Sequence, residues 1–328
     1  MKAKVLVTGA SGVLGNAVYN AFKKSSTNYE VKGLAHSRPT DELIPLDLTD
    51  EAKVKELISS FEPDWVVHCA AERRPDVAAK NPEATRTING LVPLTLSTFS
   101  ASPSHPFTLI YISTDYVFDG TSPPYEVDAK PKPLQFYGET KYGGEQATLG
   151  VTSEYGRRVV LRVPVLYGPV KVNSDSAINI LLDVVRDQSG KQYTMDHYQT
   201  RYPTNVLDIA DFLVRLADTF PNGGSSQRRL PPILHYSAPE PYTKYEMCLI
   251  LAALSNPPLS HAHITPDETE PIIMPGRVGR PRDCQLSVRS IEDPVEEGGL
   301  GMSLDTQGFK EWWEEELLRG VSSNSGNI

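Results

Sequence analysis

Short apolar runs alternate with longer stretches of helical periodicity through the first half of the chain. Runs rich in Val, Ile and Leu predict strands at residues 4–8, 30–35, 64–68, 107–113 and 158–163. Helices are expected between them at 12–24, 51–61, 82–101 and 135–149. Strands that are apolar along their whole length are usually covered on both faces, and strand–helix alternation is typical of a parallel sheet. The pattern predicts an α/β protein with helices on both sides of its sheet.

The alternation of strand and helix patterns becomes less regular beyond Pro164. Pieces rich in Pro and Gly, such as 221–232 and 256–258, separate shorter helices there. We therefore expect a smaller C-terminal substrate lobe that is interleaved with the last elements of the sheet. The expected division is 1–168 plus about 206–237 for the sheet domain, 169–205 and 238–320 for the smaller lobe, and 321–328 for a flexible polar tail.

Composition excludes several classes of partner. A chain of 328 residues can bury a sizeable core, but its net charge of −9 would repel nucleic-acid phosphates and anionic lipid. No apolar run is long enough to span a membrane, and the early first strand leaves no room for a signal peptide, so a cytoplasmic protein is expected. Cys69, Cys248 and Cys284 lie far apart without zinc or disulfide spacing, and no metal site is expected.

The first strand and helix are joined by a glycine-rich loop, residues 8–15 (TGASGVLG). Glycines in this position allow a tight turn and let the backbone approach a pyrophosphate, while the helix N-terminus offers free N–H groups and partial positive charge. The context predicts a dinucleotide-binding, Rossmann-type doubly wound parallel sheet. The candidate contacts are Gly9, Ser11, Gly12, Val13, Leu14 and Gly15.

The end of the second strand indicates which dinucleotide is bound. A site for NAD usually has a carboxylate there, but this chain has His36, Ser37 and Arg38. Arg38 can pair with a ribose 2′-phosphate, which favours NADP(H) over NAD(H); the alternative is that Arg38 is only a solvated loop residue. Asp47 and Leu48 are candidates to border the adenine, although Asp47 is equally suited to start a helix.

A second motif places Tyr137 and Lys141 four residues apart on one helical face. A nearby cation lowers the pKa of a tyrosine, so Lys141 is expected to activate Tyr137 as a proton donor. Thr114, at the end of the 107–113 strand, is expected to hold a substrate carbonyl. The same Tyr/Lys spacing also occurs on ordinary surface helices; the upstream glycine loop favours the catalytic interpretation.

These residues resemble a known group. Segments 8–15, 111–120 (YISTDYVFDG) and 137–141 look like the dTDP-4-dehydrorhamnose reductase branch of the extended short-chain dehydrogenases. Within that branch, 68–77 (HCAAERRPDV), 162–168 (RVPVLYG) and 195–206 (MDHYQTRYPTNV) are similar to the regulatory beta subunits of methionine adenosyltransferase. The resemblance covers nearly all of residues 3 to 290.

The resemblance implies an NADP(H)-binding protein that associates with a methionine adenosyltransferase catalytic subunit and modulates S-adenosylmethionine synthesis. It places Ser11 to Leu14 at the pyrophosphate and both His36 to Arg38 and Asp47-Leu48 at the adenosine end. It adds further cofactor contacts at Cys69, Ala70, Arg73, Tyr137, Lys141 and Leu166.

Two enzymatic alternatives remain open. One is an NADP-dependent oxidoreductase that reduces a 4-keto nucleotide sugar with Thr114, Tyr137 and Lys141; the other is an epimerase or dehydratase with tightly held cofactor. Segments 102–106, 222–230 and 321–328 depart from the regulatory subunits, which puts partner binding in question if the tail makes that contact. Second-lobe candidates suit either function or are salt-bridged loop residues: Asp196, His197, Arg201 and Arg282.

Overall fold

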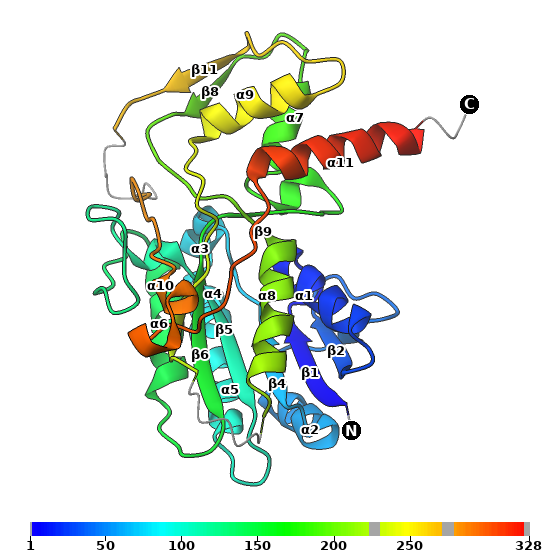
Figure 1. Ribbon diagram of the computed structural model, residues 1–328, viewed down its shortest axis with the longest axis vertical. Helices are drawn as coiled ribbons and strands as arrows, with labels where there is room; N and C mark the ends of the chain where they lie inside the picture. Colours follow the sequence, from blue (N-terminus) through cyan, green and yellow to red (C-terminus); the bar gives the residue numbers. More distant parts are fainter. Residues whose placement is uncertain (1, 223–229, 271–278, 325–328) are drawn as a thin grey trace.

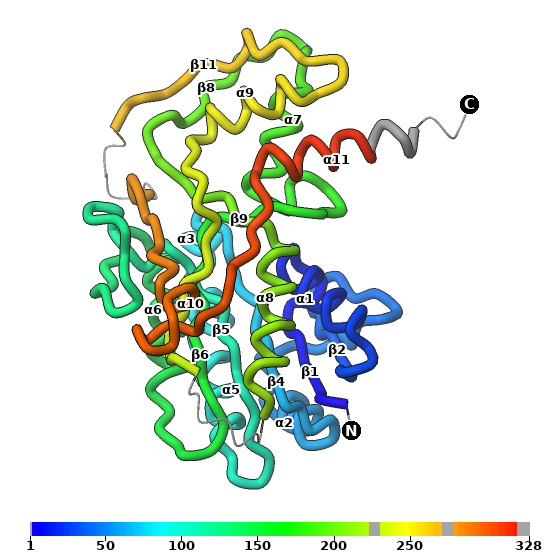
Figure 2. Tube along the Cα trace, in the orientation of Figure 1, coloured from blue at the N-terminus to red at the C-terminus, as the bar shows by residue number. Residues whose placement is uncertain are grey.

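The computed structural model describes residues 2–222, 230–270 and 279–324 (Figures 1 and 2). Its described residues form a central seven-stranded sheet in the order β10-β6-β5-β4-β1-β2-β3, and every neighbouring pair is parallel. This confirms the α/β class and the Rossmann-type parallel sheet. The strands are β1 Ala3–Thr8, β2 Tyr29–Ala35, β3 Ile44–Pro45, β4 Trp65–His68, β5 Thr108–Thr114, β6 Arg157–Val163 and β10 Ile233–His235.

Alternating side chains of the buried strands face two separate layers of helices. In β1, Val5 and Val7 belong to the core shared with α1 and α8, whereas Leu6 belongs to the core shared with α2 and α5. Successive residues of a strand point to opposite faces, so a continuous apolar run is what a doubly covered strand requires. The helices of this domain are α1 Val13–Lys24, α2 Glu51–Phe61, α3 Pro75–Lys80, α4 Pro82–Arg86, α5 Val92–Ser100, α6 Phe136–Gly150, α8 Val206–Thr219 and α10 Arg289–Glu292.

The stretch 82–101, expected as one helix, is divided by a π-helical turn, η1 Thr87–Leu91. Pro93 has no N–H to donate to the Asn89 carbonyl one turn earlier. The Tyr111 hydroxyl of β5 donates to that carbonyl instead, at 3.0 Å. A tertiary contact thus stabilises the irregular turn, and sequence periodicity alone does not show it.

A smaller lobe lies beyond the carboxyl ends of the strands, and β1 runs toward it from the N-terminus (Figure 1). Its core contains an aromatic group in which Trp312 and Trp313 both pack against Tyr167, with ring centroids 5.3 and 6.4 Å away. The elements are α7 Ile180–Arg186, α9 Lys244–Leu254, α11 Phe309–Asn324 and the parallel pair β8 Tyr193–Asp196 with β11 Ile264–Asp267. A further short parallel pair, β7 Leu166–Tyr167 with β9 Thr204–Asn205, lies at the junction.

The C-terminal part of the chain returns to the sheet domain before it ends. Ile291, Leu300 and Leu304 are buried in the same core as α1 and α8. The sequence analysis assigned all of 238–320 to the smaller lobe and did not anticipate this return. The apolar residues involved are too widely spaced to form a periodic pattern. Helix α11 includes 321–324 of the expected tail. Residues 325–328 and 223–229 of the departing loop 222–230 lie outside the described residues.

A buried polar network joins β5, β6, β10 and α6. The guanidinium of Arg162 and the carboxylate of Glu145 lie 2.7 Å apart with exposed fractions of only 2% and 3%. Nη1 of Arg162 is 3.2 Å from Nε2 of His235, whose Nδ1 is 3.1 Å from the Ser287 carbonyl. Burial and the charge of Arg162 lower the pKa of His235 to about 3. The native imidazole is therefore neutral, and Nε2 can accept from Arg162.

This network predicts a pH dependence of stability. An unfolded histidine has its ordinary pKa, 6.5. As the pH falls below that value, His235 is protonated in the unfolded chain but stays neutral in the native protein. The free energy of unfolding therefore decreases until the pH reaches the folded pKa of about 3. Relative to His235→Gln, the free energy of unfolding of the wild type should fall more steeply between pH 6.5 and 4, by about 1.4 kcal/mol per pH unit. Urea unfolding at several pH values measures both slopes; parallel slopes would contradict the buried neutral histidine.

Candidate functional site

The candidate site lies where the order of the sheet reverses. From β1 the chain builds β2 and β3 on one side and β4, β5, β6 and β10 on the other. The loops that follow β1 and β4 therefore diverge, and ligands of such sheets bind in the crevice between them. Gly9 follows β1, and Cys69 and Ala70 follow β4.

The two loops meet as closely as backbone permits. Gly9 has a φ of +65°, a conformation that L side chains rarely adopt, and a Cβ added to it would lie 2.7 Å from the Ala70 nitrogen. The Gly12 N–H donates to the Gly9 carbonyl at 2.8 Å, and a Cβ on Gly15 would run into that same carbonyl. Gly9 and Gly15 thus each have a steric reason in the structure, while a Cβ on Gly12 would be tight against the Gly9 carbonyl at 3.2 Å.

Helix α1 begins with its N–H groups free of side-chain caps. Gly12 is the N-cap residue, no side chain accepts at the cap, and the first turn contains no acidic residue. Leu14 and Gly15 are buried, whereas Ser11, Gly12 and Val13 are partly exposed. The positive end of the helix dipole therefore faces an accessible loop without a competing carboxylate in its own first turn.

The residues after β2 and β3 have different roles. His36, Ser37 and Arg38 are exposed, and His36 Nε2 lies 3.9 Å from Asp47 Oδ2. The Thr49 backbone N–H and hydroxyl both donate to Asp47, which lowers the pKa of its carboxyl.

Helix α2 is capped by Asp50, which accepts from the Lys53 N–H, so the alternative that Asp47 starts this helix is wrong. Leu48 is 8% exposed and packs in the core beside α2. The Asp47 carboxylate therefore stays at the surface while its neighbour is part of the protein interior.

A segment of the second half of the chain crosses this region. Residues 169–175, called the strap below, face the glycine loop across a cavity of about 270 Å³. Arg38 Nη1 lies 2.7 Å from Asp175 Oδ1, and Arg73 Nη2 donates to the Asp175 backbone carbonyl. Two candidate cofactor residues are therefore brought together by Asp175, which the sequence analysis did not identify.

The wall formed by the end of β4 carries no charge at neutral pH. The Thr8 hydroxyl is 2.7 Å from His68 Nδ1, and burial together with Lys141 lowers the pKa of His68 to about 3. Burial raises the pKa of the Cys69 thiol to about 12, so it is protonated and a poor nucleophile. His68 Nε2 is buried without a hydrogen-bond partner in the described structure.

Thr114 and Tyr137 lie together, but Lys141 points elsewhere. Thr114 lies beside Tyr137, whose pKa is raised, chiefly by burial. The Lys141 ammonium donates to the Ile112 carbonyl at 2.7 Å and lies 4.0 Å from the centre of the Tyr111 ring, while burial lowers its pKa to about 7.

The structure therefore does not show the lowered Tyr137 pKa expected from the Tyr/Lys spacing. Arg73 lowers the pKa of this phenol, but its effect is smaller than that of burial, so the net pKa is raised. Four-residue spacing places Tyr137 and Lys141 on one helical face, but it does not fix where a long side chain ends.

Asp115 is a further acidic group at this strand end. Thr114 Oγ1 donates to its carboxylate at 3.0 Å, and burial raises its pKa to about 7. Gln135, which precedes α6, is 6% exposed and both polar atoms of its amide are unpaired among the described residues. Neither was singled out from the sequence; the position of Asp115 directly after Thr114 was the available signal.

The second-lobe candidates are largely paired. Arg201 Nη1 contacts Asp196 Oδ2 at 2.5 Å, and His197 Nδ1 is 2.8 Å from the Thr243 hydroxyl. Arg282 lies over the ring of Tyr198, 5.1 Å from its centre. These contacts match the salt-bridged alternative for Asp196 and Arg201.

Leu166 and Lys244 lie near the junction of the lobes. Leu166 packs partly against the main core, and its carbonyl accepts from the Ser176 hydroxyl at 2.8 Å. Burial and the charges of Arg201 and Arg280 lower the pKa of Lys244 to about 8. Lys244 therefore lies close to two arginines and to Asp196, which pairs with one of them.

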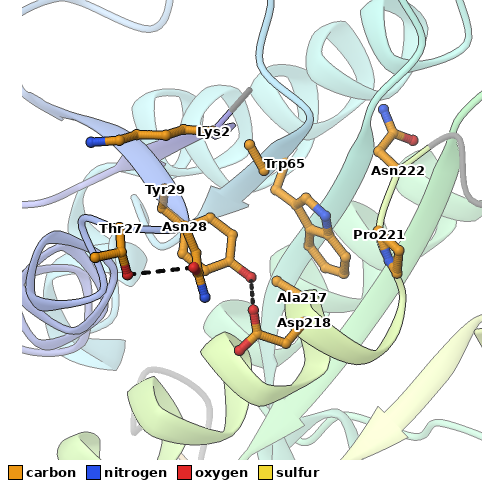
Figure 3. A pocket seen from close by; sticks show the side chains of 10 residues that line it. Lys2, Thr27, Asn28, Tyr29, Trp65, Ala217, Asp218, Pro221 and Asn222 are labelled. Atoms are coloured by element: carbon orange, nitrogen blue, oxygen red, sulfur yellow. Dashed lines mark hydrogen bonds between the residues drawn. The ribbon is translucent and has the colours of Figure 1, made fainter.

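A second hollow of about 540 Å³ lies at the opposite end of the sheet (Figure 3). It is lined near the amino ends of β1 and β4, and within it the Tyr29 hydroxyl donates to Asp218 at 2.6 Å. Because ligands of parallel sheets bind at the carboxyl ends of the strands, this hollow is separate from the candidate site.

Among the described residues, no helix combines the length and apolar character needed to cross a bilayer.

The structure resembles solved reductases and related sugar-nucleotide proteins. It matches dTDP-4-dehydrorhamnose reductase from Bacillus anthracis str. Ames in complex with NADP with a TM-score of 0.76 and 22% identity, covering 97% of this chain and 99% of that one. It matches MoeE5 in complex with UDP-glucose and NAD with a TM-score of 0.77 and 21% identity, covering 98% and 100%. These likenesses establish the fold.

Sequence comparison establishes the family. The family model described as the RmlD substrate binding domain matches residues 3–297. Methionine adenosyltransferase 2 subunit beta from Xenopus tropicalis is 42% identical over 294 residues, which cover 88% of this chain and 81% of that protein. The chain therefore belongs to the RmlD substrate binding domain family, in the group that contains the beta subunits of methionine adenosyltransferase 2.

Proposed function

We propose that this protein is an NADP(H)-binding regulatory subunit of methionine adenosyltransferase, which associates with the catalytic subunit and modulates S-adenosylmethionine synthesis. The observation that carries the proposal is the 42% identity over 88% of the chain to a protein named as the beta subunit of that enzyme. Identity at this level over nearly the whole chain supports a common role and not only a common fold.

The residues of the switch point suit a dinucleotide. Gly9, Gly12 and Gly15 keep the loop free of side chains, and the uncapped start of α1 offers N–H donors to a diphosphate. Ser11, Val13 and Leu14 would lie along the diphosphate, and the Asp47 carboxylate is accessible near the adenosine end. The remaining contacts would come from Cys69, Ala70, Arg73, Tyr137, Lys141 and Leu166. When bound, the cofactor supplies a hydride donor or acceptor.

The preference for NADP(H) over NAD(H) rests on Arg38. Both dinucleotides occur in the solved structures of similar fold, so the choice depends on this chain's own residues. Residues 36–38 lack an acidic side chain and include an exposed guanidinium. A guanidinium forms charge-assisted hydrogen bonds with a phosphate, and nothing in this segment would accept from a ribose 2′-hydroxyl as a carboxylate does.

The proposed role of Arg38 predicts a selective loss of affinity. Arg38→Gln should weaken NADPH binding roughly tenfold or more, because a charge-assisted contact to phosphate is lost, and should leave NADH binding nearly unchanged. Isothermal titration calorimetry of both dinucleotides measures this difference. Arg186→Gln, at an exposed arginine of α7, is the matched control and should change neither. Equal losses for both dinucleotides, or none, would refute the assignment of Arg38.

Association with a catalytic subunit is the second expected outcome. At micromolar concentrations the chain should co-elute with a methionine adenosyltransferase catalytic subunit in size-exclusion chromatography and change its rate of S-adenosylmethionine formation. The dTDP-4-dehydrorhamnose reductase of Bacillus anthracis, which shares the fold at 22% identity, is the control and should elute separately. Absence of a complex with this chain under the same conditions would overturn the regulatory function.

Reduction of a 4-keto nucleotide sugar is a second candidate function, favoured by the contact between Thr114 and Tyr137. The raised pKa of Tyr137 keeps its phenol protonated at neutral pH, as a proton donor to a carbonyl oxygen must be. Thr114 and Asp115 lie beside it, where a hydroxyl could hold that carbonyl.

This second function makes its own prediction. Tyr137→Phe should lower the rate of NADPH oxidation with dTDP-4-dehydrorhamnose by roughly a hundredfold or more, because the proton donor is removed, while NADPH still binds. Tyr142→Phe, on the same helix, should keep the wild-type rate. A Tyr137→Phe rate equal to that of the wild type would exclude Tyr137 as the proton donor.

A further inference from the structure

The strap is held at both of its ends, and its last residue, Asp175, contacts the sheet domain. At its base, the Asn179 side chain donates to the Gly168 carbonyl at 2.9 Å and the Ser176 hydroxyl donates to Leu166 at 2.8 Å. The Asp175 N–H donates to the Val172 carbonyl at 2.9 Å and closes the turn η3 Asn173–Asp175. These bonds hold Asp175 at the C-terminal end of the strap.

Asp175 engages the arginines of two loops that flank the switch point. Its carboxylate, with an exposed fraction of 17%, pairs with Arg38 after β2. Its backbone carbonyl accepts from Arg73, which lies after β4. The side chain and the backbone of one residue therefore hold opposite sides of the crevice, and only the Arg38 contact depends on the carboxylate.

The Asp175 carboxylate is paired with the Arg38 guanidinium, which is the group that a 2′-phosphate would also bind. Both anions bind a guanidinium through its N–H donors, and they repel each other when they share it. Resting on the proposed cofactor function, we propose that Asp175 competes with the 2′-phosphate of NADP(H) for Arg38 and thereby limits the preference of this protein for NADP(H) over NAD(H).

The competition acts on one dinucleotide only. NAD(H) has a hydroxyl in place of the 2′-phosphate and can bind without displacing Asp175 from Arg38. When NADP(H) binds, its 2′-phosphate must displace the Asp175 carboxylate from Arg38. The free energy gained from the phosphate contact is therefore partly offset by the loss of the Arg38–Asp175 pair. Arg38 is 47% exposed, and pairs this open to solvent are weak, which makes the expected effect roughly two- to fivefold in affinity.

Asp175→Asn is the direct test, because it removes the charge and keeps the shape and the backbone contact with Arg73. The variant should bind NADPH roughly two- to fivefold more tightly than the wild type and NADH equally well, as measured by calorimetry at low salt. In the Arg38→Gln background the same substitution should give no gain, since the contested guanidinium is absent.

Asp183→Asn is the matched control. This exposed carboxylate of α7 accepts from the Asn173 side chain at 2.6 Å and so supports the strap, and no contact with Arg38 or Arg73 is described for it. The Asn oxygen can still accept from the Asn173 side chain, so the variant removes a nearby negative charge without releasing the strap or changing the pairing of Arg38. We expect the NADPH affinity of Asp183→Asn to equal that of the wild type.

The outcomes separate this inference from the proposed function. If wild type and Asp175→Asn bind NADPH equally, if the variant binds it more weakly, or if NADH gains as much, the competition is refuted while cofactor binding stands. If folded wild-type protein binds neither dinucleotide, the cofactor function fails and the competition fails with it. Thermal melting of each variant establishes that it is folded before titration.

Discussion

The close approach of two backbone loops at the switch point is the constraint on which the site depends. Gly9 leaves no space for a side chain beside Ala70, and the Thr8 hydroxyl joins His68 at the ends of the same two strands. With β1 and β4 fixed in this way, the neighbouring strands deliver Arg38 on one side and Thr114 on the other. A larger residue at the first glycine would separate the two halves of the site from each other.

The chemistry of the site follows from burial. His68, the Cys69 thiol and the Tyr137 phenol are all held neutral at ordinary pH, because charging them would remove solvation that the interior does not replace. An anionic ligand would thus be attracted mainly by the arginines at the rim and the start of α1. Binding a dinucleotide and turning over a substrate are separate properties of such a site, so one fold can serve both reductases and regulatory proteins.

The sequence was sufficient to predict the five longer strands of the sheet, the helices between them and the glycine loop, because each depends on local periodicity or on a short motif. The sequence analysis missed the short strands β3 and β10, whose two and three residues are too few to show a pattern. It could not predict contacts made between distant segments: Arg38 and Asp175 are 137 residues apart, and no local pattern joins them. The π-helical turn depends on the Tyr111 hydroxyl of another strand. The direction of the Lys141 side chain likewise depends on the Ile112 carbonyl, which helical spacing does not reveal.

The repeated passage of the chain between its two lobes has a consequence for its architecture. Strand β10 and helix α8 complete the sheet domain only after the chain has visited the smaller lobe, and Ile291, Leu300 and Leu304 come back to the main core later still. Several covalent connections therefore bridge the lobes, so no single cut yields two autonomous folding units. One lobe can therefore be replaced by another only if several separate segments of the sequence change together. This constraint favours keeping the whole architecture while individual side chains change.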